Sequence, residues 1–306
     1  MEDSDPPPGP PRVFLIFGDL HGKILPAFRL ASCWAKDHGR TVAGLLQVGD
    51  MGYFPDPSRI DKATLRHAEK DPLELGTFDI IEPNDLADRV FGDPNAPPGL
   101  WFTAGNHEDF EALDRLARVS GRQTDFVVDA YCRIRGIKDG MIVELPPKSE
   151  GETPLPQPAE LPLRVGAIWG VDGDAPNARR NLPRRAYIWD KSIDRLLHTE
   201  FDVLLSHDAP ADARWVGAGS RPLRSLIELA QPAFAFFGHY SGDGSQIEQD
   251  FGRTAVFHMA GLELRGRDGC PTPGSVGVLE WADGAGSFEY VPDDWLKTFT
   301  RHNWKW

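Results

Sequence analysis

The sequence predicts an α/β fold in which buried strands alternate with amphipathic helices. Five short runs of apolar, β-favouring residues recur along the chain, and each ends abruptly at a glycine or at a polar residue that is typical of loops. A segment with apolar residues at helical spacing separates the first run from the second, as in a strand–helix–strand unit of a parallel sheet. The five runs lie at 14–17, 44–48, 100–103, 201–205 and 233–237.

Each apolar run is followed closely by side chains that commonly bind metals. Asp19 and His21 are two residues apart, a spacing that puts both side chains on one side of an extended strand end. Groups at the carboxyl ends of strands in an open α/β sheet converge on one crevice, so we expect these side chains to meet. The residues concerned are Asp19, His21, Asp50, Asn106, His107, His207 and His239.

Three helices are predicted from the spacing of apolar residues. Residues 24–38 have a helical apolar pattern and stop at Gly39, which is typical of a helix C-terminus. An amphipathic pattern predicts a second helix over 109–119, and a third is expected over 222–230.

The remaining strands are predicted from alternation and turn residues. Residues 126–145 alternate in polarity and contain Lys138-Asp139-Gly140, which predicts a β-hairpin. A strand is expected over 163–169. The segments at Ile247, 254–258, 276–281 and 288–291 are predicted to form strands of a second sheet.

The chain is interpreted as one domain over residues 12–306. Residues 1–11 are acidic and Pro-rich, so they are expected to form a flexible tail rather than a secretory signal. Insertions are expected at about 53–98 and 146–190, where proline and charged residues interrupt the pattern. The tryptophans of residues 292–306 are expected to pack onto the body of the domain.

The composition disfavours binding to nucleic acid and to membranes. The 306 residues carry a formal net charge of −13, and the sequence pI is near 5.1, so bulk binding to nucleic acid or anionic membranes is disfavoured. No apolar run approaches the ~18 residues that span a bilayer, so we expect a soluble, cytoplasmic protein. Cys33, Cys132 and Cys270 are far apart, as expected of unpaired thiols in a reducing compartment.

The motifs resemble a known superfamily in their order along the chain. Gly18-Asp19-x-His21-Gly22, Gly49-Asp50-x-Gly52, residues 105–108 (GNHE), His207 and Gly238-His239 are similar to the motifs of the calcineurin-like metallophosphoesterases. The resemblance covers about residues 12–291. It implies a four-layer sandwich of two mixed β-sheets flanked by helices, and a metal-dependent phosphoesterase activity in which a metal-activated hydroxide attacks the ester.

The resemblance also implies roles for the motif residues. Two divalent cations roughly 3.5–4 Å apart, with Mn, Fe or Zn as the metals, would share one carboxylate, and Asp50 is the natural bridge. The first metal would be held by Asp19, His21 and Asp50, and the second by Asp50, Asn106, His207 and His239. His107 would protonate the leaving oxygen or stabilise the charge of the transition state.

The last motif departs from the superfamily pattern at Ser241. The superfamily usually has a second histidine there, which completes the shell of the first metal. A neutral hydroxyl is a poor replacement for imidazole, so the first site would bind its metal weakly, hold additional water or recruit another ligand. Ser241 itself, His258 and Asp243 are the candidates for that ligand.

A cluster of arginines forms the densest positive patch of this acidic sequence. Guanidinium groups offer paired donors to phosphate oxygens, so a phosphate-recruiting edge is one interpretation and a solvated loop is the other. The arginines are Arg179, Arg180, Arg184 and Arg185. The layout of residues 163–241 also resembles that of RNA lariat debranching enzymes, although the cysteine common in their first motif is Asp19 here.

These observations favour a metal-dependent phosphoesterase. Its substrate would be a phosphomonoester or phosphodiester of a small phosphorylated molecule, a nucleotide or a phosphoprotein. The alternatives are a lariat-debranching-like 2′,5′-phosphodiesterase and a non-catalytic, metal-binding interaction module on the same fold.

Overall fold

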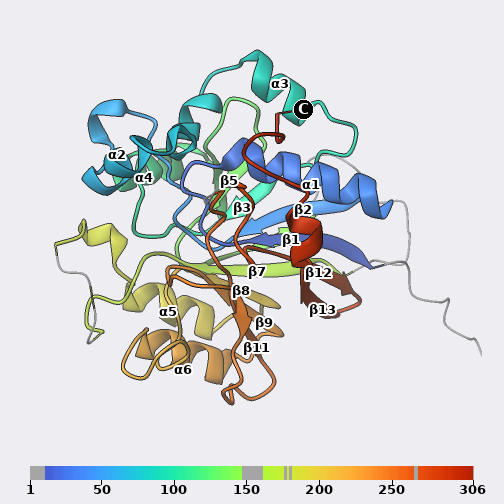
Figure 1. Ribbon diagram of the computed structural model, residues 1–306. Helices are drawn as coiled ribbons and strands as arrows, with labels where there is room; N and C mark the ends of the chain where they lie inside the picture. The colour runs from blue at the N-terminus through green and yellow to red at the C-terminus, as the bar shows by residue number, and fades with distance from the viewer. Residues whose placement is uncertain (1–10, 147–160, 176–177, 179–180, 265–267, 306) are drawn as a thin grey trace, which may run out of the picture.

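Two mixed β-sheets form the centre of the protein in a computed structural model, which describes residues 11–146, 161–175, 178, 181–264 and 268–305. The first sheet has seven strands in the order β13-β12-β1-β2-β3-β5-β4, and the second has six in the order β10-β11-β9-β8-β7-β6. Helices cover the outer face of each sheet, which gives four layers (Figure 1). The predicted α/β sandwich is therefore confirmed.

The first sheet has a parallel centre and antiparallel edges. Strands β1, β2, β3 and β5 run parallel, whereas β12 pairs antiparallel with β1 and β4 pairs antiparallel with β5. The strands of this sheet are β1 (Arg12–Phe17), β2 (Val42–Gln47), β3 (Leu100–Phe102), β4 (Asp125–Val127), β5 (Ile134–Ile137), β12 (Val276–Ala282) and β13 (Ala285–Tyr290).

The second sheet follows the same plan. Strands β7, β8, β9 and β11 run parallel, and the antiparallel strands β6 and β10 lie at its edges. Its strands are β6 (Met141–Leu145), β7 (Leu163–Ile168), β8 (Val203–Ser206), β9 (Phe234–Phe237), β10 (Ser245–Gln246) and β11 (Ala255–His258).

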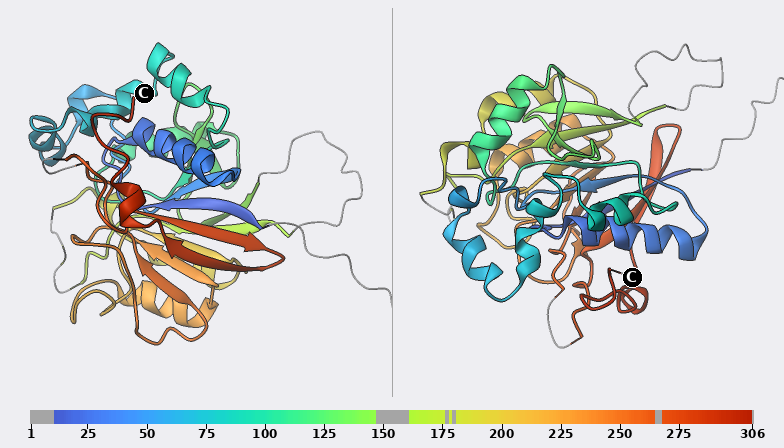
Figure 2. Two further views of the ribbon diagram at one scale, coloured as in Figure 1. Left: turned by 45° about the vertical axis from the view of Figure 1, so that its right-hand side comes forward. Right: turned by 90° about the horizontal axis from the view of Figure 1, so that it is seen from above.

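The helices divide between the two outer faces. In Figures 1 and 2, α1 to α4 lie over the first sheet, and α5 and α6 lie under the second. The α-helices are α1 (Ile24–His38), α2 (Lys62–Ala68), α3 (Asp85–Phe91), α4 (Phe110–Val119), α5 (Asp190–Leu197), α6 (Arg221–Ala230) and α7 (Asp293–Leu296). The 3-10 helices are η1 (Pro57–Arg59), η2 (Pro72–Asp79) and η3 (Arg184–Ala186).

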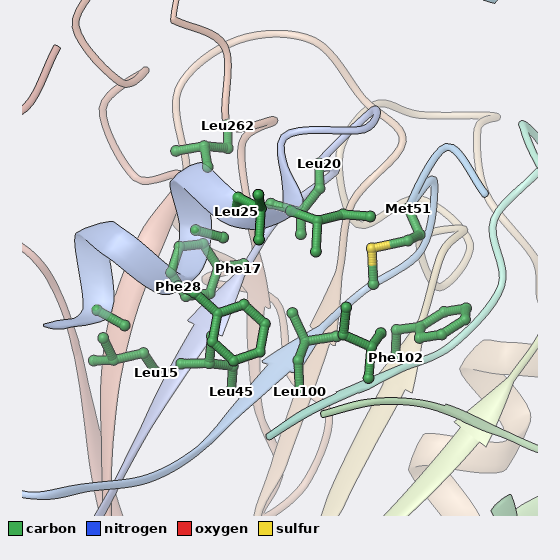
Figure 3. Packing of buried hydrophobic residues seen from close by; sticks show 14 of the residues in the cluster. Leu15, Phe17, Leu20, Leu25, Phe28, Leu45, Met51, Leu100, Phe102 and Leu262 are labelled. Carbon is green, nitrogen blue, oxygen red and sulfur yellow. The ribbon is translucent and has the colours of Figure 1, made fainter. Parts of the chain in front are cut away.

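The central strands of the two sheets are mainly apolar because both of their faces are buried. Side chains alternate along β1, so Leu15 and Phe17 pack under the helices of the first sheet, whereas Phe14 and Ile16 pack between the sheets. Figure 3 shows Leu15 and Phe17 beside Phe28 of α1. A third cluster fills the space between the second sheet and the helices α5 and α6. The five strand ends are thus fixed by three packed layers of side chains.

The helix over 24–38 is confirmed at both ends. Gly39 has the left-handed conformation that terminates a helix, with φ of 59°, and its N–H bonds to carbonyls of the last turn. The other two predicted helices correspond to α4 and α6. Residues 292–305 also pack as expected, since Trp304 is buried in the core under the helices, whereas Trp306 lies outside the described residues.

Two predictions about strand pairing are wrong. The predicted hairpin at residues 138–140 does not form, because β5 belongs to the first sheet and β6 to the second, and the chain crosses between the sheets at this turn. The segments β12 and β13 were expected in the second sheet, but β12 pairs with β1 in the first. Only β10 and β11 of that group lie in the second sheet. Turn residues and alternation report local conformation and do not identify the partner strand.

The expected insertion at 53–98 holds α2, α3 and two short 3-10 helices. Most of the expected insertion at 146–190 and the tail at residues 1–10 lie outside the described residues. None of the helices in the described part of the chain is both long and apolar enough to cross a membrane.

Candidate metal centre

The candidate site lies where strand ends from both sheets meet. The loops after β1, β2 and β3 carry Asp19, Asp50 and Asn106 from the first sheet, and those after β8 and β9 carry His207 and His239 from the second. Backbone hydrogen bonds join the ends: Gly170 N–H, after β7, donates to the carbonyl of Ala104, after β3. The site is therefore built by both sheets rather than by one.

The structure brings the predicted ligands together in two groups. Oxygen and nitrogen atoms of Asp19, His21 and Asp50 lie within 4.8 Å of one another, and those of Asp50, His207 and His239 do the same. Asp50 belongs to both groups. This arrangement provides two adjacent positions for cations with one carboxylate between them.

Backbone conformation in the motif loops is unusual at three of the ligand-type residues. His21, Asp50 and His239 have positive φ values of 42°, 50° and 66°, which L-amino acids rarely adopt. Such conformations cost free energy and are typical of functional sites. The loop conformations therefore bring these side chains together at a cost in backbone free energy.

Neighbouring glycines let the loops approach the ligands closely. A Cβ atom on Gly105 would overlap the backbone nitrogen and side chain of Asp50, and a Cβ atom on Gly238 would overlap the carboxylate of Asp19. Both glycines are therefore required by contact with a ligand rather than by turn geometry.

Hydrogen bonding around His207 indicates that a cation fits this place. Its Nε2 atom lies 3.3 Å from Oδ2 of Asp50, 3.3 Å from Oδ1 of Asn106 and 3.2 Å from Nδ1 of His239. A single proton on Nε2 can satisfy only one of these three neighbours. Asn106 turns its amide oxygen towards this cluster, and its amide nitrogen is buried without a partner within the described residues. A cluster with more acceptors than protons suits a divalent cation.

The two buried carboxylates differ in acid–base behaviour because different neighbours act on them. Desolvation raises the pKa of Asp19 to about 7, and the nearby Asp50 adds to this rise. Burial also opposes ionisation of Asp50, but His207 and His107 hold its pKa well below the ordinary value. The backbone N–H groups of Asn106 and His107 both donate to Oδ1 of Asp50, at 2.7 and 2.8 Å. Asp50 is therefore the residue best prepared to carry negative charge.

The histidines of the cluster also differ in their pKa values. Burial lowers the pKa of His21 to about 4, so its imidazole is neutral and can donate a lone pair. Burial has the same tendency at His207, but Asp50 and Asp19 outweigh it and raise the pKa to about 9. A bound cation would take the place of the proton that these carboxylates attract.

His107 is held by a carboxylate that the sequence analysis did not identify. Its Nδ1 atom lies 2.7 Å from Oδ2 of Asp61, while Oδ1 of Asp61 accepts from the N–H of Thr64 and caps α2. The spacing Asp61-x-x-Thr64 could have indicated a helix cap, but it contains no sign of contact with His107. The rings of His107 and His21 lie 5.9 Å apart, so His107 borders the first group.

Segment 53–98 supports the motif loops at two more points. Lys23, in the loop of the first motif, is buried and pairs with Glu74 of η2 at 2.7 Å. The hydroxyl of Thr77 donates to the carbonyl of Gly52 at 2.7 Å. The segment is therefore packed against the site.

Glu108 and Gln47 hold the backbone around Asp50. Glu108 is buried and accepts N–H groups of Met51 and Tyr53 at 2.8 and 2.7 Å; burial raises its pKa to about 8. Gln47 donates to the carbonyl of Gly18 and accepts from the N–H of Gly49, which joins the ends of β1 and β2. Sequence reasoning left the role of Glu108 open and did not identify Gln47.

His258 and Asp243, two of the candidates for an additional first-site ligand, do not join either group. Ser241 is exposed, and its carbonyl accepts from Arg214 at 3.2 Å. His258 is buried, with Nε2 2.8 Å from the carbonyl of Tyr240 and Nδ1 3.2 Å from the carbonyl of Asp243. Both ring nitrogens thus contact the backbone of the last motif, which indicates a supporting role for His258.

Tyr240 is fixed from the opposite side by Asp208. The Tyr240 hydroxyl donates to Oδ1 of Asp208 at 2.6 Å, and the other carboxylate oxygen accepts from the N–H of Asp172 at 2.8 Å. Tyr240 follows His239 directly, and their rings lie 5.1 Å apart. Asp208, which sequence reasoning also did not single out, therefore helps to position His239.

The arginine cluster lies only partly within the described residues. Arg179 and Arg180 are outside them. Arg184 lies 5.2 Å from the ring centre of Trp189, and Arg185 pairs with Asp114 and Asp139. A pocket of about 390 Å³ beside His107 is bordered by residues 181–183 and by neither of these arginines.

Comparisons with known proteins support the fold. No family model and no curated protein matches the chain. One solved structure aligns over 92% of this chain and all of its own length, with 15% identity and a TM-score of 0.50. TT1561 of Thermus thermophilus aligns over 92% of this chain and all of its own, with 12% identity and a TM-score of 0.46. The 5′-nucleotidase of Candida albicans aligns over 97% of this chain and 55% of its own, with 14% identity and a TM-score of 0.43. The alignment with a TM-score of 0.50 supports a shared fold and, at 15% identity, carries no information about substrate.

Proposed function

We propose that this chain is a metal-dependent phosphoesterase on a two-sheet α/β sandwich, because its motifs resemble those of the calcineurin-like metallophosphoesterases. The observation that carries the proposal is the position of Asp50 in both ligand groups, each within 4.8 Å. Phosphate ester hydrolysis by two metals requires such a shared carboxylate between adjacent cations.

The donor set is suited to two divalent cations. Asp19, His21 and Asp50 would hold the first, and Asp50, Asn106, His207 and His239 the second. Mn, Fe and Zn accept this mixture of imidazole, carboxylate and amide donors. When bound, such cations would polarise the phosphoryl oxygens and lower the pKa of water.

His107 is the proposed general acid. Asp61 holds its Nδ1 atom, which assigns proton transfer to the leaving oxygen to Nε2. Asp61 therefore acts as a positioning residue that also stabilises the protonated imidazole. The acceptor contacts of Glu108 keep the backbone at residues 51–53, and with it Asp50, in place.

The pocket beside His107 favours a small substrate. Its volume of about 390 Å³ is in the range of sites for small molecules or for a single phosphorylated side chain. The net charge of −13 disfavours a long polyanion. We therefore expect a small phosphorylated molecule, a nucleotide or a phosphoprotein as substrate.

Hydrolysis of p-nitrophenyl phosphate and bis(p-nitrophenyl) phosphate with added Mn²⁺ tests the proposal. Wild type should release nitrophenol, and Asp50→Asn should not, because the amide cannot bridge two cations. Glu248→Gln is the matched control, since Glu248 is exposed and lies outside both groups. Equal activity of wild type and Asp50→Asn would exclude the two-metal reaction, and absence of turnover in wild type on both esters would count against the enzyme.

A non-catalytic metal-binding module is the second candidate. It is favoured by one observation, the exposed Ser241 at the place where the superfamily pattern has a metal-binding histidine. Metal content separates the candidates when it is measured together with turnover. Bound metal without hydrolysis of any phosphate ester would favour the module.

A further inference from the structure

A second pocket, which shares no lining residue with the one beside His107, lies where the helical layers of the two sheets approach each other. We call it the α4–α5 groove; its volume is about 560 Å³. It is lined by the second half of α4, by the crossing turn at residues 138–139 and by α5 with the segment before it. Figure 1 shows α4 and α5 on the same side of the molecule, one over each sheet. The pocket beside His107 instead borders the first turn of α4.

Arg185 gives the α4–α5 groove a fixed wall. Its guanidinium lies 3.1 Å from Asp114 of α4 and 3.4 Å from Asp139 of the crossing turn, and 5.0 Å from the ring centre of Trp169. Asp139 is buried and also accepts from the hydroxyl of Ser192 at 2.7 Å. Asp114 and Asp139 are the carboxylates that line the groove, and both are engaged by Arg185.

Four other cations line the groove, and within the described residues none of them pairs with a carboxylate. Lys138 donates to the carbonyl of Arg122, and Arg195 lies 3.4 Å from the carbonyl of Asp139. Lys191 lies over the ring of Trp189 at 4.1 Å. The fourth is Arg118, on the exposed surface of α4.

This local excess of positive charge opposes the charge of the whole chain. The sequence has 46 acidic and 33 basic residues, yet five cationic side chains and two carboxylates line the groove. Like charges gathered in a hollow repel one another, and an anion in the hollow relieves that repulsion.

We propose that the α4–α5 groove binds a small polyanion, a molecule with two or more phosphate groups, at a site separate from the metal centre. Guanidinium groups bind phosphate oxygens through paired donors, and lysines contribute charge. Three cations already lie within 5.2 Å of the ring centre of Trp189, so the indole holds the cations in place instead of receiving a base. The groove thus recognises charge rather than an aromatic group, and this inference does not depend on the proposed phosphoesterase activity.

Calorimetric titration of the full chain with inorganic tripolyphosphate tests this inference. The double reversal Lys191→Glu/Arg195→Glu should weaken binding by about tenfold or more, because it removes two unpaired cations and adds repulsion. Binding should also weaken with added salt. The control is Arg66→Glu/Lys70→Glu, which makes the same charge change at two exposed residues outside the groove and should change the dissociation constant by less than about twofold.

The Asp50→Asn variant separates the groove from the metal centre. Tripolyphosphate should bind this variant as it binds wild type. If Asp50→Asn abolishes binding while the groove variant retains it, the anion binds at the metals and the inference is wrong. Equal losses in the groove variant and the surface control would show non-specific attraction and would also overturn it. If circular dichroism shows that the double reversal does not fold, Lys191→Gln/Arg195→Gln replaces it, because this variant removes the two charges without adding repulsion. Unchanged tripolyphosphate binding by the glutamine variant would then refute the site.

Discussion

The two ligand groups around Asp50 differ in how completely they are built. In the second group, Asn106 and His207 are buried, and Nε2 of His207 lies within 3.3 Å of three other groups. In the first group, the side chain of His21 is 26% exposed and its Nε2 lies 3.9 Å from Oδ2 of Asp50. The exposed Ser241 occupies the position that would complete this group in the superfamily pattern.

The difference predicts unequal metal affinity. A set of four donors of which three are buried holds a cation more tightly than a more exposed set of three, because water competes less and the side chains are already oriented. The second position should therefore retain its metal during purification, and the first should fill only when metal is supplied. Variants at Asp50, within each group and beside the groups test whether the two positions differ in this way.

Asp50→Asn should have the largest effect. Both positions lose their common carboxylate, so metal content should fall towards zero and turnover should be lost. Metal analysis of protein purified without chelator measures this, with Glu248→Gln as the control. If Asp50→Asn keeps the metal content of wild type, Asp50 does not bridge the two groups.

His107→Ala should lower turnover by roughly 10²–10⁴ with metal content intact, because the change removes a proton donor and no ligand. Steady-state rates and metal analysis together check this. The exposed His67 supplies the control His67→Ala, for which no change is expected. Loss of metal in His107→Ala would place His107 among the ligands.

Asp61→Asn should reduce turnover less than His107→Ala, because an amide still contacts Nδ1 but cannot stabilise the imidazolium. The defect should be larger for phenyl phosphate than for p-nitrophenyl phosphate, since the poorer leaving group needs the proton more. Equal defects on both substrates would mean that Asp61 only caps α2.

Ser241→His should strengthen the weaker group. In the superfamily pattern an imidazole at this position completes the first group, so metal occupancy should rise and the Mn²⁺ concentration needed for half-maximal activity should fall by about tenfold. Ser245→His, on the neighbouring strand β10, is the control. Unchanged metal stoichiometry in Ser241→His would show that the first group is already complete.

His258→Asn should change stability rather than metal content. Burial lowers the pKa of His258 to about 4 in the folded protein, so between pH 4 and about 6.5 the unfolded chain binds a proton that the folded chain does not. Stability should therefore fall on acidification through this range, by on the order of 3 kcal/mol from this residue, and the variant should lose that part of the dependence. Urea unfolding at several pH values measures it. A drop in metal content would instead identify His258 as a ligand.

The order of the strand-end motifs carried most of the information about the site. Asp19, Asp50 and His239 each follow a run that is buried on both faces, so their placement at strand ends could be inferred from local pattern. The same reasoning predicted α1 to its C-terminal Gly39. Local sequence patterns were therefore sufficient to place strand ends and helix α1, because each of these features depends on a single segment.

Pairing and long-range contacts were not accessible in this way. The turn at 138–140 has hairpin chemistry, but Asp139 is engaged by Arg185 and Ser192, and the strands on either side enter different sheets. Asp61 contacts His107 across 46 residues, and its sequence context indicates only a helix cap. Arg185 was identified by its charge, whereas its salt bridges to Asp114 and Asp139 depend on how α4 and the crossing turn pack.

The sequence was sufficient to identify the candidate ligands at the strand ends, the alternation of buried strands and helices, and the departure at Ser241, because periodicity and residue chemistry are local properties. Tertiary packing was needed to show that both sheets contribute to the candidate metal site, that Asp61 holds His107, and that cations without a carboxylate partner among the described residues gather between α4 and α5. Those features arise from contacts between segments far apart in the chain, whose geometry is fixed by the packing of three apolar layers.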